Sequence, residues 1–160
     1  MSYASYSASS VMTTPVISIS PEVTLKEAIN ILAESKISGL PVVDADNKVV
    51  GVITEKDIVN YASTLHVIPL LRSSGWVSPH TDVDDIASFK KGYELLSNVK
   101  VEKVMSRKPH TVKKSAYIAE VANLMNKKNV NRIPVVDEEG KLAGIIARAD
   151  LVTYLARRES

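Results

Sequence analysis

Apolar residues recur along the chain in a fixed order of spacings, and this order occurs twice. A short apolar run comes first, then a stripe at helical spacing, then two β-branched runs around a polar turn, then a second helical stripe. The segments with this pattern are 16–19, 25–32, 40–53 and 58–65 in the first stretch, and 110–112, 118–125, 133–146 and 151–155 in the second. Each stretch is therefore predicted to be a β-α-β-β-α unit.

The two stretches are copies of one another. A shift of 93 residues superposes 104–154 on 11–61 with 14 of 51 positions identical, and it places Pro134-Val135-Val136-Asp137 on Pro41-Val42-Val43-Asp44. Such a period indicates a repeat architecture. A three-stranded sheet with helices on one side leaves its other face open, so we expect the repeats to pack sheet to sheet about a pseudo-twofold axis. The predicted class is α/β in the broad sense, of the α+β type.

The repeats set the expected domain boundaries. Repeat one spans 11–65 and repeat two 104–160, and residues 1–10, rich in Ser and Tyr, are expected to be disordered. Residues 66–103 are too long for a plain linker and are predicted to be an ordered insertion. Its one helix begins at Thr81 or Asp82 and carries an apolar face. The residues of that face are Ile86, Phe89, Tyr93 and Leu96.

Composition narrows the functional classes. The chain has 160 residues and no cysteine, which excludes disulfide frameworks, thiol nucleophiles and cysteine-based metal sites. No apolar run approaches the ~18 residues of a membrane span, so we expect an intracellular, cytoplasmic protein. The net charge of +2 divides unevenly: 11–61 has four basic and seven acidic residues, whereas 104–154 has nine and five. An anionic ligand should therefore be attracted mainly to repeat two.

Thr54 and Asp57 stand where a predicted strand ends and a helix begins at once. A threonine hydroxyl with a carboxylate three residues later is a good helix cap, as is predicted for Thr24 and Glu27. The same carboxylate can accept the hydroxyls of a vicinal diol, while the free N–H groups of a helix start attract anions. On the residues alone both interpretations stay open.

Catalytic patterns are weak in this sequence. Neither of the two Gly-rich phosphate loops is present, and the three histidines are scattered without ligand spacing. The acids near His80 are explained by the start of a helix, so no metal site is expected. We therefore expect no enzymatic activity.

At this point the residues support a family resemblance. Each repeat resembles a CBS domain, and the pair resembles a tandem CBS module, also called a Bateman module. The features are Val-Met at the opening, the apolar helix, the Pro-Val-Val-Asp block, a Val-Gly-Val-Ile type of strand and the Asp after it. The matching repeats leave no room for a catalytic domain, so the chain resembles the stand-alone CBS-pair proteins.

The resemblance implies a regulatory or sensor module. Such modules bind adenosine-containing ligands in the clefts between the repeats, usually AMP, ADP or ATP and less commonly S-adenosylmethionine. They commonly pair into a flat homodimer, and we expect an unidentified protein to be regulated. No cofactor is implied beyond the regulatory nucleotide.

The resemblance also assigns roles to residues. In the family motif the counterpart of Asp57 binds the ribose hydroxyls and that of Thr54 lies near ribose and phosphate. Repeat two keeps Asp150 but has Ala147 in place of the hydroxyl, whereas its Arg132 matches a basic residue that holds phosphate in several relatives. Arg148 and Lys108 are weaker phosphate candidates. The candidates for the adenine pocket are Val16, Ile37, Leu40 and Pro41, with Ile133 and Pro134 in the other cleft.

By this resemblance, repeat one has the complete ribose-binding motif, and repeat two has the basic residue expected to bind phosphate, Arg132. We expect one stronger adenine-nucleotide site, not two equal ones, with the phosphates of one nucleotide approaching Arg132. Two other functions stay open: nucleic-acid binding, suggested by the basic second repeat although no recognition motif is present, and protein interaction without a ligand.

Overall fold

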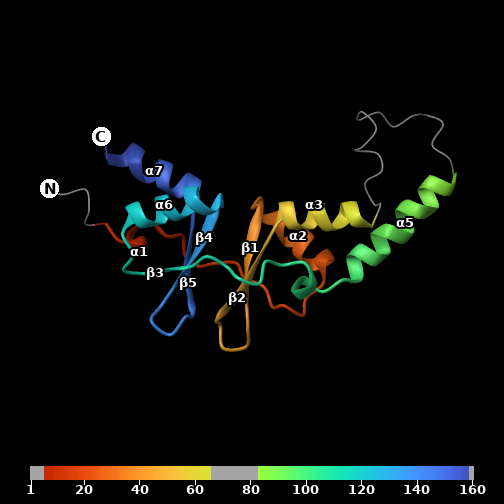
Figure 1. The fold of residues 1–160 in the computed structure, drawn as a ribbon, viewed down its shortest axis with the longest axis horizontal. Helices are drawn as coiled ribbons and strands as arrows, with labels where there is room; N and C mark the ends of the chain where they lie inside the picture. The colour runs from red at the N-terminus through yellow and green to blue at the C-terminus, as the bar shows by residue number, and fades with distance from the viewer. Residues whose placement is uncertain (1–5, 66–82, 159–160) are drawn as a thin grey trace. The chain divides into compact units, whose positions relative to one another are not determined.

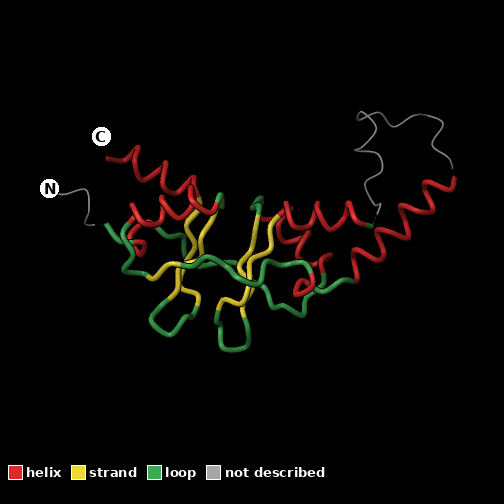
Figure 2. The backbone as a smooth tube through the Cα atoms, in the orientation of Figure 1, coloured by secondary structure: helices red, strands yellow, loops and turns green. Residues whose placement is uncertain are grey.

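The computed structural model describes residues 6–65 and 83–158, and Figure 1 shows the helices and strands that they form. In chain order these are α1 (Ala8–Val11), α2 (Leu25–Ser35), β1 (Gly39–Val43), β2 (Val49–Thr54), α3 (Glu55–Thr64), α5 (Val83–Asn98), a 3₁₀ turn (Val101–Lys103), β3 (Val112–Lys113), α6 (Ile118–Lys128), β4 (Arg132–Val136), β5 (Leu142–Ala147) and α7 (Arg148–Arg158). Among the described residues there are two small sheets, one of two strands and one of three (Figure 2). The predicted α+β class is confirmed.

The chain divides into two compact units that do not follow the repeats in a simple way. One unit consists of Met1–Ser18, Pro41–Val52 and Arg107–Ser160, and the other of Ile19–Leu40 and Ile53–Ser106. Each unit therefore contains most of one repeat together with segments from outside it.

Repeat two forms a three-stranded sheet covered by α6 and α7 (Figure 1). Strand β3 runs parallel to β4, with Val112 opposite Val135. Strands β4 and β5 are antiparallel, with Arg132 opposite Ala147. The predicted β-α-β-β-α order is present in this repeat.

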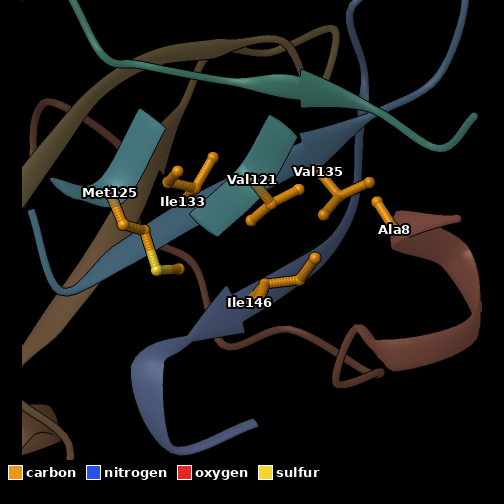
Figure 3. Packing of buried hydrophobic residues seen from close by; sticks show 6 residues of the cluster. All are labelled: Ala8, Val121, Met125, Ile133, Val135 and Ile146. Carbon is orange, nitrogen blue, oxygen red and sulfur yellow. The ribbon is translucent and has the colours of Figure 1, made fainter. Parts of the chain in front are cut away.

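Six buried residues form the core between this sheet and its helices. Figure 3 shows their side chains gathered together: Ala8, Val121, Met125, Ile133, Val135 and Ile146. Strand residues at alternate positions and helix residues four apart point to one side, so the two periodicities of the sequence meet here. Five of the six come from repeat two, and the sixth, Ala8, comes from α1.

The N-terminal segment 6–13 is part of this unit, and the expected disorder of residues 1–10 is wrong for residues 6–10; residues 1–5 lie outside the described part. Ala8 has no exposed surface, and its N–H donates to Ala116 O at 2.7 Å. The Tyr6 ring lies 5.5 Å from that of Tyr154 between centroids. A Cβ added at Gly144 would lie 2.4 Å from the Met12 sulfur. The segment escapes prediction because its partners are more than a hundred residues away.

Repeat one differs from repeat two in its first predicted strand. Residues 16–19 form no strand, and within the described part of the chain the sheet of this repeat consists of β1 and β2. In repeat two the N–H of Lys114 donates to Val136 O at 3.1 Å just after β3. Pro21 stands at the position equivalent to Lys114 and has no N–H, so this pairing cannot form.

The insertion helix α5 is confirmed, although its predicted face is only partly correct. Leu96 is buried and α5 packs on α2, but Tyr93 is 47% exposed. Burial follows the i, i+4 pair Gly92 and Leu96 instead, because these two positions lie one above the other on the helix. The predicted cap residues and the side chains of Ile86 and Phe89 lie outside the described part.

Both hairpin turns are closed by an aspartate in the same manner. Asp44 Oδ1 accepts from the N–H groups of Asp46 and Lys48, each at 2.9 Å. Asp137 Oδ1 accepts from Glu139 and Lys141, also at 2.9 Å. This is the side-chain to backbone bonding that makes Asp frequent in turns.

Because of these bonds, the stability of the second hairpin should depend on acid pH. The N–H of Lys141 lowers the pKa of Asp137 below its ordinary value; partial desolvation opposes this, while the N–H of Glu139 and the ammonium groups of Lys141 and Lys114 reinforce it. A depressed folded pKa stabilises the protein above the unfolded value of about 3.9 and loses that effect as the pH falls through the folded pKa.

We expect the gap in unfolding free energy between wild type and Asp137→Asn to shrink in urea melts from pH 5 to pH 2.5. The exposed Glu138 offers a control, because Glu138→Gln removes the same charge without touching the turn bonds. An equal pH dependence of the gap in both variants would contradict this role of Asp137.

Candidate functional site

Two strand–helix junctions occupy equivalent places in the repeats. Strand β2 ends at Thr54 where α3 begins, and β5 ends at Ala147 where α7 begins. With no residue in between, the first N–H groups of each helix lie at the end of a strand. These groups have no partner within the helix, so each junction can accept an anion or a carboxylate.

At the repeat-one junction, Thr54 and Asp57 form a complete capping box. The Asp57 N–H donates to Thr54 Oγ1 at 3.2 Å, and the Thr54 N–H donates to Asp57 Oδ2 at 2.9 Å. The Thr54 hydroxyl also donates to the same Oδ2 at 2.9 Å. Both bonds to the carboxylate end on Oδ2, so the cap leaves Oδ1 for a further donor. Asp57 can therefore cap the helix and accept a ligand hydroxyl at once, and the two interpretations of the sequence are compatible.

The segment before β1 is held at the same junction. The Glu55 N–H donates to Ser38 O at 2.9 Å, which brings Ile37 and Gly39 beside the start of α3. Leu40 is fully buried, whereas Ile37 keeps part of its surface exposed. Repeat one thus joins an acidic cap and a partly exposed apolar side chain in one unit.

At the repeat-two junction half of the capping box remains. The Ala147 N–H donates to Asp150 Oδ2 at 2.8 Å, but Ala147 has no hydroxyl to return the bond. Instead the Thr13 hydroxyl lies 3.4 Å from Asp150 Oδ1, close to the limit of a hydrogen bond. Thr13 is held there by two backbone bonds with Ile145, at 2.8 and 3.2 Å. Thr13 could not be chosen from the sequence, because its only signal is its place in the opening segment.

Arg132 is the first residue of β4 and lies opposite Ala147 in the register of the sheet. Directly opposed residues of an antiparallel pair have Cβ atoms about 5 Å apart. The side chain is half-buried and starts beside the first turn of α7, which also carries Asp150. Repeat two therefore places the backbone of Arg132 and the start of the helix that carries Asp150 at one end of the sheet.

Arg148 makes three side-chain hydrogen bonds within its own unit. Its Nε donates to Asn131 Oδ1 at 3.0 Å, one terminal nitrogen to Asn126 Oδ1 at 3.2 Å and the other to Met125 O at 3.2 Å. These bonds join the start of α7 to the end of α6. Lys108 is exposed and lies four residues before β3.

The adenine candidates differ in exposure. Leu40, Pro41, Ile133 and Pro134 are fully buried in the structure as it stands, and Val16 and Ile37 are half-buried. By the division of the chain, Val16 and Pro41 are counted with the unit that carries repeat two. Ile37 and Val16 are thus the candidates with surface left for a ligand.

Other kinds of site find little support in the described part of the chain. There, no three His, Asp or Glu side chains gather as a metal site would require. No helix within 6–65 and 83–158 has the length and apolar character to cross a membrane.

Comparison with known sequences gives a consistent family. The profile of the CBS domain matches residues 8–64 and again 101–157. An uncharacterized protein of Methanocaldococcus jannaschii, MJ1426, is 37% identical over 135 residues, which are 82% of this chain and 80% of that protein. The chloroplastic CBS domain-containing protein CBSX1 of Arabidopsis thaliana is 31% identical over 84% of this chain, which spans 56% of its length.

Solved structures give the same fold. CBSX2 in complex with AMP has a TM-score of 0.72 and 24% identity over 97% of this chain and 99% of that one. The CBS domain pair of protein MJ0100 in complex with 5′-methylthioadenosine and S-adenosyl-L-methionine has a TM-score of 0.69 and 23% identity over 96% and 98%. The repeat, the paired junctions and these matches agree: the chain belongs to the CBS domain family and carries two copies of the domain.

Proposed function

We propose that this chain is a regulatory module that binds an adenine nucleotide, AMP, ADP or ATP, and thereby controls a partner protein. The observation that carries the proposal is the geometry of the Thr54–Asp57 junction. Both hydrogen bonds of the helix cap end on Asp57 Oδ2, so Oδ1 can still accept a bond from a ligand. A ribose diol needs such an acceptor, and the positive end of the α3 dipole favours a phosphate nearby. The bound AMP in CBSX2 and the bound adenosine compounds in the MJ0100 pair support this ligand class.

The experiment is a calorimetric titration of the purified protein with AMP, ADP, ATP, adenosine and S-adenosylmethionine. Binding should also raise the melting temperature, because a ligand at 100 times its Kd stabilises the fold by about 2.7 kcal/mol. Mass spectrometry of freshly purified protein would identify a ligand that remains bound. If none of the five compounds gives heat or a thermal shift at millimolar concentration, the proposed ligand class is wrong.

We further propose that the module pairs with a second copy through exposed apolar positions on its helices. Val152 and Leu155 of α7 are 65% and 64% exposed, and Val59 of α3, the repeat-one equivalent of Val152, is 51% exposed. Large apolar side chains left in water at equivalent positions fit a symmetric partner.

Sedimentation equilibrium should therefore show a dimer that Val152→Glu together with Leu155→Glu converts to monomer. The matched control is Thr153→Glu on the same helix, which adds a charge at a position that is already polar. A wild-type monomer at 100 μM would contradict the pairing.

A further inference from the structure

The start of α3 has little capacity left to bind an anion through its backbone. Three of the N–H groups that a helix start leaves without an internal acceptor are already bonded here. The Thr54 N–H donates to Asp57 Oδ2 at 2.9 Å, the Glu55 N–H to Ser38 O at 2.9 Å, and the Asp57 N–H to Thr54 Oγ1 at 3.2 Å. These are the groups that a phosphate usually binds at a helix N-terminus, so most of this binding capacity is used within the protein.

The side chains of the same turn oppose an anion as well. Glu55 is the first residue of α3 and Asp57 the third, and with Lys56 between them the turn has a net charge of −1. Glu55 is exposed, at the end of the helix where the dipole is positive. A carboxylate in this place stabilises the helix by opposing its dipole. In the same way it reduces the attraction of that dipole for a phosphate.

Repeat two has the opposite charge at the equivalent position. Arg148 is the first residue of α7 and stands 93 residues after Glu55. The backbone bond is the same in both repeats, because the Arg148 N–H donates to Asn131 O at 2.9 Å. The two junctions therefore share one backbone arrangement and differ in the charge at the first position of the helix.

The charge of the surrounding unit has the same sign as Glu55. The unit that contains the repeat-one junction, Ile19–Leu40 with Ile53–Ser106, has ten acidic and eight basic residues. The other unit has eight acidic and twelve basic residues. The Thr54–Asp57 junction thus lies in the acidic unit, which is least favourable for the ligand with the most phosphate groups.

We propose that Glu55 is a specificity-determining residue, which makes the repeat-one junction select adenosine compounds of low negative charge, a nucleoside or a monophosphate, over ATP. This inference rests on the proposed function. The α-phosphate of a nucleotide is one sugar ring away from the hydroxyls that we assign to Asp57, well within the ~10 Å over which charges interact at 0.1 M salt. Each further phosphate adds repulsion from Glu55, while the adenine and ribose of the ligand stay the same.

The test is the affinity of adenosine, AMP, ADP and ATP, measured by calorimetry at low salt with EDTA, so that no metal ion neutralises the phosphates. In the wild-type protein the affinity should fall from AMP to ATP. Glu55→Gln should raise the ATP affinity about three- to tenfold and leave adenosine unchanged, as expected for one charge that acts on several across water at roughly 8 Å. Glu55→Arg, which copies repeat two, should raise it further.

Salt provides a test that needs no substitution, and it serves if the variants unfold. Added salt screens repulsion as well as attraction. The ratio of ATP affinity to adenosine affinity in the wild-type protein should therefore rise with salt concentration. A ratio that falls with salt would mean that the phosphates are attracted, and it would overturn the inference.

The matched control is Glu94→Gln, which removes an exposed carboxylate from α5 in the same unit and leaves the first turn of α3 intact. It should not change the ratio of the ATP and adenosine affinities. The effect of Glu55→Gln should also persist in an Asp150→Ala background, where the repeat-two junction has lost its carboxylate.

Equal effects of Glu55→Gln and Glu94→Gln, or a wild-type affinity that rises from AMP to ATP, would overturn the selection by Glu55 alone. Failure of the wild-type protein to bind any of the four compounds would overturn the proposed function, and this inference with it.

Discussion

Asp57→Ala should lower adenine-nucleotide affinity by roughly 10- to 100-fold, the range expected for a lost hydrogen bond to a charged group. The physical reason is that the capping box uses only Oδ2 of this carboxylate. The remaining oxygen, at the mouth of the α3 N-terminus, is the acceptor that we assign to the ribose hydroxyls. Isothermal titration with AMP, ADP and ATP measures the effect.

The same substitution removes a helix cap, so loss of affinity must be separated from loss of stability. Loss of a cap costs about 1 kcal/mol. Glu27→Ala is the matched control, because Glu27 is the third-position carboxylate of the equivalent box with Thr24 at the start of α2. That box lies at the far end of an 11-residue helix from the β1 junction, about 16 Å away along the axis. Glu27→Ala should therefore lower the unfolding free energy in urea melts by a similar amount and leave the nucleotide affinity unchanged.

The two repeats should not respond equally. Asp150 lacks the hydroxyl partner on its own repeat, and its Oδ1 already faces the Thr13 hydroxyl at 3.4 Å. We therefore expect Asp150→Ala to reduce affinity less than Asp57→Ala. Equal losses would contradict one stronger site, and unchanged affinity in Asp57→Ala would remove this residue from the site.

The parts of this fold that could be predicted are those with local causes. The capping boxes of α2 and α3 follow from residues three apart, and the hairpins follow from β-branched runs around polar turns. The family follows from the same local signals, because they recur after 93 residues. Thr54, Asp57 and Arg132 could be chosen as candidates for this reason.

The parts that could not be predicted depend on distant partners. The sequence marks Arg148 only as a positive charge, whereas in the structure its side chain donates to two asparagines that lie 17 and 22 residues away. The missing first strand of repeat one depends on a single N–H that Pro21 lacks. A pattern of apolar positions contains neither kind of information.

Ala8→Asp should destabilise the protein by about 3–5 kcal/mol, because it places an unpaired charge where no water can reach it. Ala8 has no exposed surface and is one of the six core residues of the unit that carries repeat two. Ala8 lies beside Val135 in this core (Figure 3), so removal of the segment would uncover part of it. Urea unfolding followed by circular dichroism gives the free energy directly.

The neighbouring Ser9 provides the control. It is exposed, so Ser9→Asp should change the unfolding free energy by less than about 0.5 kcal/mol. Gly144→Ala tests the same attachment from the other side, since its new Cβ would lie 2.9 Å or less from three atoms of Met12. Adding Met12→Ala to the Gly144→Ala variant should restore part of the lost unfolding free energy, because the shorter side chain leaves space for the new Cβ. An equally small loss of unfolding free energy in Ala8→Asp and Ser9→Asp would show that α1 is not needed for stability. A much larger loss in Ala8→Asp would show that the core of repeat two depends on residues that precede repeat one.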